Sequence, residues 1–254
     1  MNHERKELQA GVAAAALGQA KSFSPGARAL VLAGEDWHEG VIGIVASKVV
    51  ELHYKPTVMV TFHTHNGLGK GSVRAAGRVD VLEALEVCGD LLMGFGGHKA
   101  AAGLTIRREC LEEFRSRFNE AVERQVQERL GGSLTRELHV DAEVSDAREL
   151  VAPAVRAMDR LSPFGIGNAE PVIAWRGSWV KSHRTMKEKH LKLSFKGSAH
   201  DEVEGVWFNA AGALDGILGV PVDVAFVPQI NTYRNAQAVQ LKVRDARANP
   251  VQTA

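Results

Sequence analysis

The sequence is poor in cysteine and in net charge, and it lacks any long apolar run. Its 254 residues include two cysteines, Cys88 and Cys110, whose separation matches no zinc or redox spacing. We therefore expect buried free thiols in a reducing compartment. The polar start, residues 1–6, lacks the apolar core of a signal peptide, and no apolar run approaches the ~20 residues of a membrane span. These absences predict a cytoplasmic protein with no membrane partner.

Clusters of metal-ligating side chains are also scarce. The run Glu35–Glu39 carries acids beside His38, but we interpret it as a helix entrance, because carboxylates are common there for capping reasons. His63 and His65 flank a turn, and a structural zinc site needs four ligands, which the neighbourhood does not supply. We therefore expect loop histidines and no metal site in this chain.

A stretch of small residues surrounds one histidine at Phe95–Gly103. The adjacent Gly96 and Gly97 allow backbone N–H groups to approach an anion closely, and successive exposed N–H groups in a turn form an anion-binding nest. His98 would then donate to a phosphate or orient one. The alternative is a tight turn before a strand, which a bare Gly-Gly-His favours. A second phosphate-suited element nearby shifts the interpretation to a phosphate site.

That second element lies in an acid-free stretch from residue 67 to residue 79. Lys70, Arg74 and Arg78 supply positive charge, and Ser72 supplies a hydroxyl. In an extended segment Ser72 and Arg74 point to the same face. A hydroxyl beside a guanidinium suits a terminal phosphate, because arginine can bind it bidentately. The alternative is a solvated basic loop. Together the two elements predict a phosphate-binding pocket.

Strands and helices alternate in the first half of the chain, which predicts an α/β domain. A helix over residues 3–20 and a break at residues 22–27 precede it, and Gly131-Gly132 ends it. The second half is mainly β, with strands expected near residues 172–183, 189–196, 202–208, 221–230 and 236–244. A strand at 137–144 and helices at 146–161 and 210–218 complete it, as in a small OB-type barrel.

Net charge is only +1, yet two stretches of the second half are locally basic. Residues 176–192 hold six cations, Lys181 and Arg184 among them, against one acid. Residues 224–244 hold no acid and include Tyr233 and Arg234 in an expected loop. OB-folds bind single strands with a basic groove and aromatic stacking platforms. Trp175 and Trp179 are four apart and would share one face of a strand; packing in the barrel core is the stronger alternative for them.

The motif order resembles a known family. The run Asp36–Ser47, the Gly71–Arg74 strand and the Gly96–His98 turn occur in the order found in RecJ-like single-strand-specific 5′→3′ exonucleases of the DHH phosphoesterase superfamily. The resemblance implies an α/β DHH-associated domain followed by a mainly β OB-fold barrel. It divides the chain into a connecting helix at 1–25, a DHH-associated domain at 26–131, an OB-fold at 132–248 and a disordered tail at 249–254.

The resemblance also implies a division of labour. Such enzymes hold two manganese or magnesium ions with Asp and His motifs that are not in this sequence, so we expect no catalytic residue here and no activity of this chain alone. This part would hold single-stranded DNA, and single-strand-binding protein and repair helicases are the implied partners. The alternatives are a stand-alone single-strand-binding or adaptor protein, and an RNA-directed relative. The residues expected to contact the strand are Lys70, Ser72, Arg74, Arg78, Gly96, Gly97, His98, Lys181, Arg184, Tyr233 and Arg234.

Overall fold

The computed structural model describes residues 2–24, 26–63, 67–146, 149–165, 167–197, 202–232 and 238–249. The chain divides into two compact units, Met1–Glu137 and Leu138–Ala254. The division falls a few residues after the double glycine at Gly131-Gly132. Among the described residues, no helix is long and apolar enough to cross a membrane. Each unit has its own hydrophobic core.

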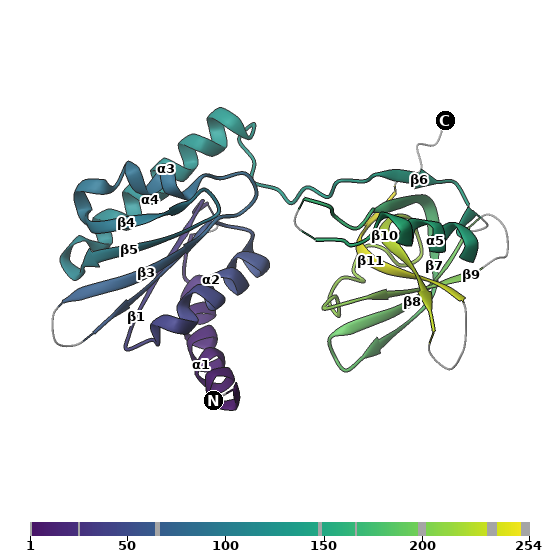
Figure 1. Ribbon diagram of the computed structural model, residues 1–254, viewed down its shortest axis with the longest axis horizontal. Helices are drawn as coiled ribbons and strands as arrows, with labels where there is room; N and C mark the ends of the chain where they lie inside the picture. Colours follow the sequence, from purple (N-terminus) through teal and green to yellow (C-terminus); the bar gives the residue numbers. More distant parts are fainter. Residues whose placement is uncertain are drawn as a thin grey trace. The chain divides into compact units, whose positions relative to one another are not determined.

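The first unit is built on a mixed five-stranded sheet (Figure 1). Its strand order is β1-β2-β3-β5-β4, with β1 and β2 parallel and the other neighbours antiparallel. The helix α2 (Glu39–His53) connects the two parallel strands. The strands are β1 (Leu30–Glu35), β2 (Thr57–Phe62), β3 (Leu68–Arg74), β4 (Leu92–His98) and β5 (Ala101–Arg107).

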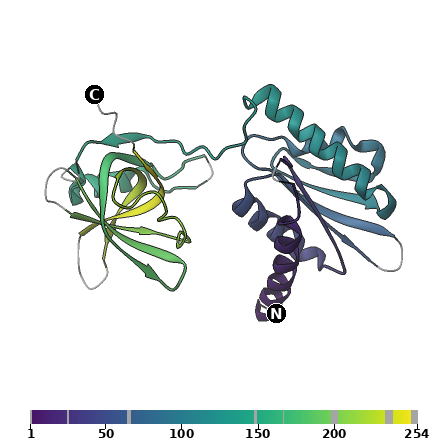
Figure 2. The same cartoon turned by 180° about the vertical axis from the view of Figure 1, so that it is seen from behind.

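Helices cover both faces of this sheet, as the two opposite views show (Figures 1 and 2). The helices α1 (Asn2–Ala20) and α2 pack on one face. The opposite face carries α3 (Val81–Glu86) and α4 (Leu111–Arg129). Successive side chains of β1 pack on opposite faces of the sheet. Leu30 and Leu32 pack with α1 and α2, whereas Val31 packs with α4. Short 3₁₀ turns at Gly89–Leu91 and Arg108–Cys110 join the remaining elements.

The helix starts differ in detail from their predictions. His38, not an acid, caps α2, and its Nδ1 accepts a hydrogen bond from Gly40 N at 3.0 Å. Asp80 caps α3 by accepting from the amides of Leu82 and Glu83, both at 3.1 Å. No reciprocal capping box forms at α3, because the amide of Asp80 donates to Gln125 Oε1 and the carboxylate of Glu83 pairs with an arginine of α4.

The predicted turn at Gly96–His98 was wrong, because these residues belong to β4. Gly96 pairs with Gly103 and His98 with Ala101 across an antiparallel hairpin, and the turn itself is Lys99-Ala100. β4 is an edge strand. An extended strand points successive amides to opposite sides, so these residues do not form the predicted nest of adjacent N–H groups.

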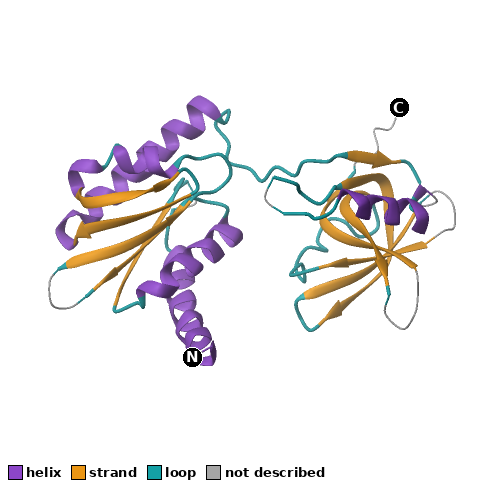
Figure 3. Cartoon of the chain, viewed as in Figure 1, coloured by secondary structure: helices purple, strands orange, loops and turns teal. Residues whose placement is uncertain are grey.

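The second unit is a closed five-stranded barrel with a sixth strand added (Figure 3). Its barrel order is β7-β8-β9-β11-β10, closed by pairing of β10 with β7, and β6 extends the sheet beside β7. The helix α5 (Ala152–Met158) and a 3₁₀ turn (Asp159–Leu161) accompany it. The strands are β6 (Ala142–Val144), β7 (Ile173–Met186), β8 (His190–Lys196), β9 (Glu202–Trp207), β10 (Pro221–Asn231) and β11 (Ala238–Ala248).

Two predictions for this unit were wrong. Residues 211–219 form turns rather than a helix. Trp175 and Trp179 do not share a face, because the register of β7 against β10 shifts between them, where Gly177 has a φ of +65°. Trp175 is buried in the barrel core, whereas Trp179 is 37% exposed. The predictions for the loop residues Tyr233 and Arg234 and for most of the 249–254 tail lie outside the described residues.

Candidate nucleic-acid-binding groove

A groove of about 450 Å³ runs over β3, β5 and β4 on the face that carries α2. Glu39 and Ile42 of α2 form one wall, and the strands form the floor. The described lining residues are Glu39, Ile42, Lys70, Gly71, Ser72, Gly94, Phe95, Gly96, Gly103, Leu104 and Thr105. Of the predicted contact residues, Lys70, Ser72 and Gly96 line the groove, whereas Arg74, Gly97 and His98 are not among its described lining residues.

Cross-strand pairing explains how the floor is made. Ser72 pairs with Gly103, and Gly103 pairs with Gly96, so these three residues form one row across the sheet. A Cβ added at Gly96 would meet no atom within 4 Å, and one at Gly103 would meet only a backbone oxygen at 3.7 Å. Glycine therefore leaves this row without side chains beyond Ser72. The result is a shallow surface onto which a sugar or a base can lie flat.

The next row supplies a cation at one end of the floor. Lys70 pairs with Thr105, and Lys70 Nζ donates to Thr105 Oγ1 at 3.0 Å. Both side chains line the groove. The ammonium of Lys70 is thereby oriented over β5 while it stays exposed to solvent.

Ser72 and Arg74 form a hydrogen-bonded pair, which confirms the prediction that they share a face. Arg74 Nη1 donates to Ser72 Oγ at 2.9 Å and to Val73 O at 2.8 Å. The helix α2 passes close over this pair at Gly43, where an added Cβ would lie 2.7 Å from Arg74 Nη2 and 2.9 Å from Ser72 Oγ. Only a residue without a side chain fits between the helix and the pair in this conformation, so Gly43 leaves the room that the oriented guanidinium occupies.

The Lys70 end of the groove also carries an acid, Glu39 of α2, and a histidine of the segment after β2 lies beside it. His63 Nε2 lies 2.9 Å from Glu39 Oε1, and His63 Nδ1 lies 3.7 Å from Asp36 Oδ1. The hydrogen bond with Glu39 raises the pKa of His63 above its ordinary value. His63, expected to be a plain loop histidine, therefore balances the negative charge of the wall residue Glu39.

The remaining predicted residues of the first unit fall into three places. His98 is exposed and lies in the row of Arg74, with Ala101 of β5 between them. Gly97 faces the other side, and a Cβ there would lie 2.5 Å from Ala101 O, so its role is to allow close strand packing. Arg78 does not line the groove; its Nη2 pairs with Glu137 at 3.1 Å.

Five cations in the basic stretches of the second unit pair with acids that lie outside those stretches. Lys181 pairs with Glu202 across the barrel sheet, and Arg184 is exposed on β7. Four other cations are ion-paired as Lys181 is, namely in the pairs Arg176–Glu143, Lys192–Glu204, Lys242–Glu170 and Arg244–Glu170. An acid-free window of sequence is therefore not an acid-free surface here.

Sequence reasoning missed the glycine floor and the acidic wall. Gly94 and Gly96 alternate along β4, as do Gly103 and Thr105 along β5. Glycine at every second position of a strand removes side chains from one face, and this period-two spacing is the signal that could have revealed the floor. Nothing in the sequence indicated that His63 reaches Glu39, because the contact joins two elements 24 residues apart.

Two domain families match the chain. The DHHA1 domain matches residues 26–124, and the RecJ OB domain matches residues 140–245. The first range contains every residue that lines the groove, and the second contains the barrel strands β6 to β10 entirely. The chain carries the DHHA1 and OB domains of the RecJ family.

Individual RecJ proteins match over almost the whole chain. The single-stranded-DNA-specific exonuclease RecJ of Bacillus subtilis is 28% identical over 97% of this chain and 31% of its own length. Crystal structures of Thermus thermophilus RecJ with Mn²⁺ and with Mg²⁺ each superpose with a TM-score of 0.78 and 28% identity. They cover 98% of this chain and about a third of their own (35% and 36%). The chain thus spans about a third of the length of these relatives.

The metals of those RecJ structures raise the question of whether this chain could hold one. The cluster of Asp36, Glu39 and His63 does not fit a metal ion. Each imidazole nitrogen of His63 faces a different carboxylate, so the three side chains bridge one another instead of converging on one point. Among the described residues, no group of three histidines, cysteines or acids has metal-site geometry.

Proposed function

We propose that this chain is the substrate-holding part of a RecJ-type 5′→3′ single-stranded-DNA exonuclease. The observation that carries the proposal is the groove, in which a floor without side chains lies between Lys70 and the Ser72–Arg74 pair. A flat, partly basic surface suits a flexible strand, since sugars and bases need contact area and phosphates need cations. The similarity to RecJ proteins supports the choice of substrate.

Each groove residue has a proposed role. Ser72 and Arg74 hold the 5′ end or the first phosphate, because a hydroxyl and an oriented guanidinium together offer several donors to one phosphate. Lys70 contacts the next phosphate over the floor. His98, exposed at the end of the edge strand β4, contacts a further phosphate, and Gly96 leaves the floor beside it open. Hydrolysis in the intact enzyme would use manganese or magnesium held by residues other than those described here.

The OB barrel is proposed to guide the strand beyond the groove. Arg184 is exposed on β7 and Lys181 precedes it on the same strand. Trp179 adds an exposed aromatic ring two residues before Lys181. Aromatic side chains next to cations are the usual single-strand surface of OB-folds. In the whole protein, single-strand-binding protein and repair helicases would deliver or expose the strand.

The 5′-end assignment can be tested with two matched strands. Labelled oligothymidylates of about 12 nucleotides, with and without a 5′ phosphate, are titrated into the chain by fluorescence anisotropy. Replacing Arg74 by Gln should weaken binding of the phosphorylated strand about tenfold, because charge-assisted hydrogen bonds are lost. The hydroxyl-ended strand should be affected much less. Arg129→Gln, on the opposite face of the sheet, is the control. Equal losses on both strands, or none, would refute the assignment.

A further inference from the structure

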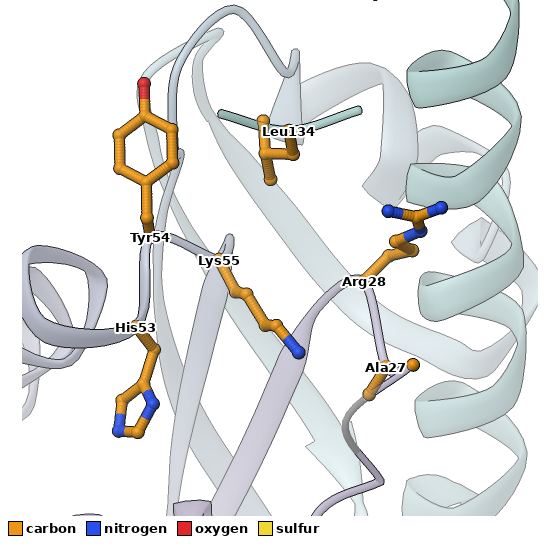
Figure 4. Close-up of a pocket in the computed structure, with 7 residues that line it drawn as sticks. Ala27, Arg28, His53, Tyr54, Lys55 and Leu134 are labelled. Carbon is orange, nitrogen blue, oxygen red and sulfur yellow. The ribbon is translucent and has the colours of Figure 1, made fainter. Parts of the chain in front are cut away.

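A second cavity of the first unit lies where α2 ends and β1 and β2 begin (Figure 4). Its volume is about 240 Å³. No described residue lines both this cavity and the groove. The cavity lining consists of Gly26, Ala27, Arg28, His53, Tyr54, Lys55 and Leu134.

The described lining of this cavity is positively charged. The lining holds the ammonium of Lys55, the guanidinium of Arg28 and the imidazole of His53, and none of the described lining residues is acidic. Burial lowers the pKa of the Lys55 ammonium, and the nearby charge of Arg28 lowers it further. Two cations that destabilise one another inside a partly closed space favour an anion between them.

The arginine of the cavity is fixed by the fold. The guanidinium of Arg28 pairs with Glu123 of α4 and donates to Gly132 O at 3.3 Å. Its own backbone amide donates to Asn119 Oδ1 at 2.9 Å. Arg28 is therefore a preorganised donor whose charge Glu123 balances, and Lys55, with its flexible four-carbon stem, is the more adaptable donor.

Cations at this place could instead stabilise the C-terminus of α2, but a residue outside the cavity lining does so. A helix C-terminus carries partial negative charge. Arg136 serves that end, because its guanidinium bonds Glu51 O and lies 5.3 Å from the ring centroid of Tyr54. Lys55 instead runs from the start of β2 toward Ala27 at the start of β1, away from the last turn of α2 (Figure 4).

We infer that this cavity binds a phosphate group between Lys55 and Arg28, with His53 at its rim. The phosphate belongs either to a small phosphate monoester or to the backbone of a nucleic-acid strand. A phosphate accepts from both an ammonium and a guanidinium, and the cavity is large enough for it and a few waters. The inference does not depend on the proposed function, because it rests on no residue of the groove.

The test uses the full chain with ¹³C-labelled lysine, titrated with inorganic phosphate and followed by NMR. The Cε resonance of Lys55 should shift saturably, and its pKa should rise, because a bound anion relieves the repulsion from Arg28. Lys55→Gln should weaken phosphate binding, read from the amides of Gly26 and Ala27, about tenfold. Lys55→Arg should retain it. Arg74→Gln, in the groove, should leave it unchanged.

The variants and the competition experiments decide whether the site exists and which phosphate it takes. If phosphate still shifts the amide resonances of Gly26 and Ala27 in Lys55→Gln with undiminished affinity, the inference is overturned. It is also overturned if this shift is lost in Arg74→Gln. Competition by an unphosphorylated oligothymidylate would assign the phosphate to a strand backbone, whereas competition only by thymidine monophosphate would assign it to a free monoester. Both of these results support the site. If single-strand binding in the groove fails while phosphate still binds here, the proposed function falls and this inference stands.

Discussion

Replacing Gly43 by Ala gives a sharp test of the groove, because stability and binding should change in opposite directions. Gly43 lies inside α2, where Ala is favoured over Gly by about 1 kcal/mol. The new methyl group would lie 2.7 Å from Arg74 Nη2 and 2.9 Å from Ser72 Oγ. Ordinary contacts of a methyl carbon are at least ~3.5 Å, so the guanidinium must move by most of an ångström.

Displacement of the Arg74 guanidinium should change stability little but affinity strongly. Arg74 Nη2 is the far end of a flexible side chain, so the protein can yield there at little cost, and the free energy of unfolding should stay the same or rise by up to ~1 kcal/mol. The hydrogen bond from Arg74 to Ser72, 2.9 Å in this structure, should be lost. Because the pair is then no longer oriented for a phosphate, affinity for a 5′-phosphorylated strand should fall about tenfold.

The assay combines urea unfolding with anisotropy titration of phosphorylated oligothymidylate. Gly11→Ala in α1 is the matched control, since an added Cβ there meets no atom within 4 Å. The control should gain the same helix propensity and keep full affinity. Two results would refute the reasoning: wild-type affinity in Gly43→Ala, or a loss of affinity that tracks a loss of stability.

Three further outcomes are expected from the structure. Gly97→Ala should lower the free energy of unfolding by ~1–3 kcal/mol in urea melts, because a Cβ there meets backbone at 2.5 Å, whereas Gly96→Ala should be nearly neutral. The pKa of His63 is raised in the fold, so its contribution is full below its unfolded pKa and lost as pH rises through the folded one. His63→Asn should therefore destabilise more at about pH 5 than at about pH 9. Trp175→Ala should cost ~3–5 kcal/mol and Trp179→Ala far less, measured in the same melts.

The sequence predicted the two-domain order and most barrel strands because hydrophobic periodicity is a local property. It predicted the shared face of Ser72 and Arg74 for the same reason, since that face depends only on β3 being extended. The Gly96–His98 segment was misread as a turn. Glycine has little strand preference of its own, and these residues are extended because β5 pairs with them.

The features that the sequence could not predict depend on contacts between elements that are distant in the sequence. Gly43 matters through a helix that crosses β3, and the Trp175–Trp179 alternation fails through one bulge at Gly177. A single inserted residue moves every later side chain of a strand to the other face. Such register changes depend on the partner strand, so a period-two pattern alone could not show which tryptophan is exposed.

Charge pairing in the barrel leads to a final prediction about salt. For single strands, the slope of log affinity against log salt concentration is about −0.7 per phosphate neutralised. If Lys70, Arg74 and one barrel cation contact phosphates, the slope should be about −2. If the five ion-paired cations of the basic stretches in the barrel also contacted the strand, the slope would approach about −5.6.

Removing one acid separates these cases. Glu170 pairs with both Lys242 and Arg244, so Glu170→Gln frees two cations without adding any. The slope should then steepen by up to about 1.4 and binding should tighten at low salt, if the strand passes over β11. Glu83→Gln, which frees Arg129 on the first unit, should leave the slope unchanged. A slope of about −5.6 in the unmodified chain would show that the ion pairs open on binding, and that the groove is a minor contributor to strand capture.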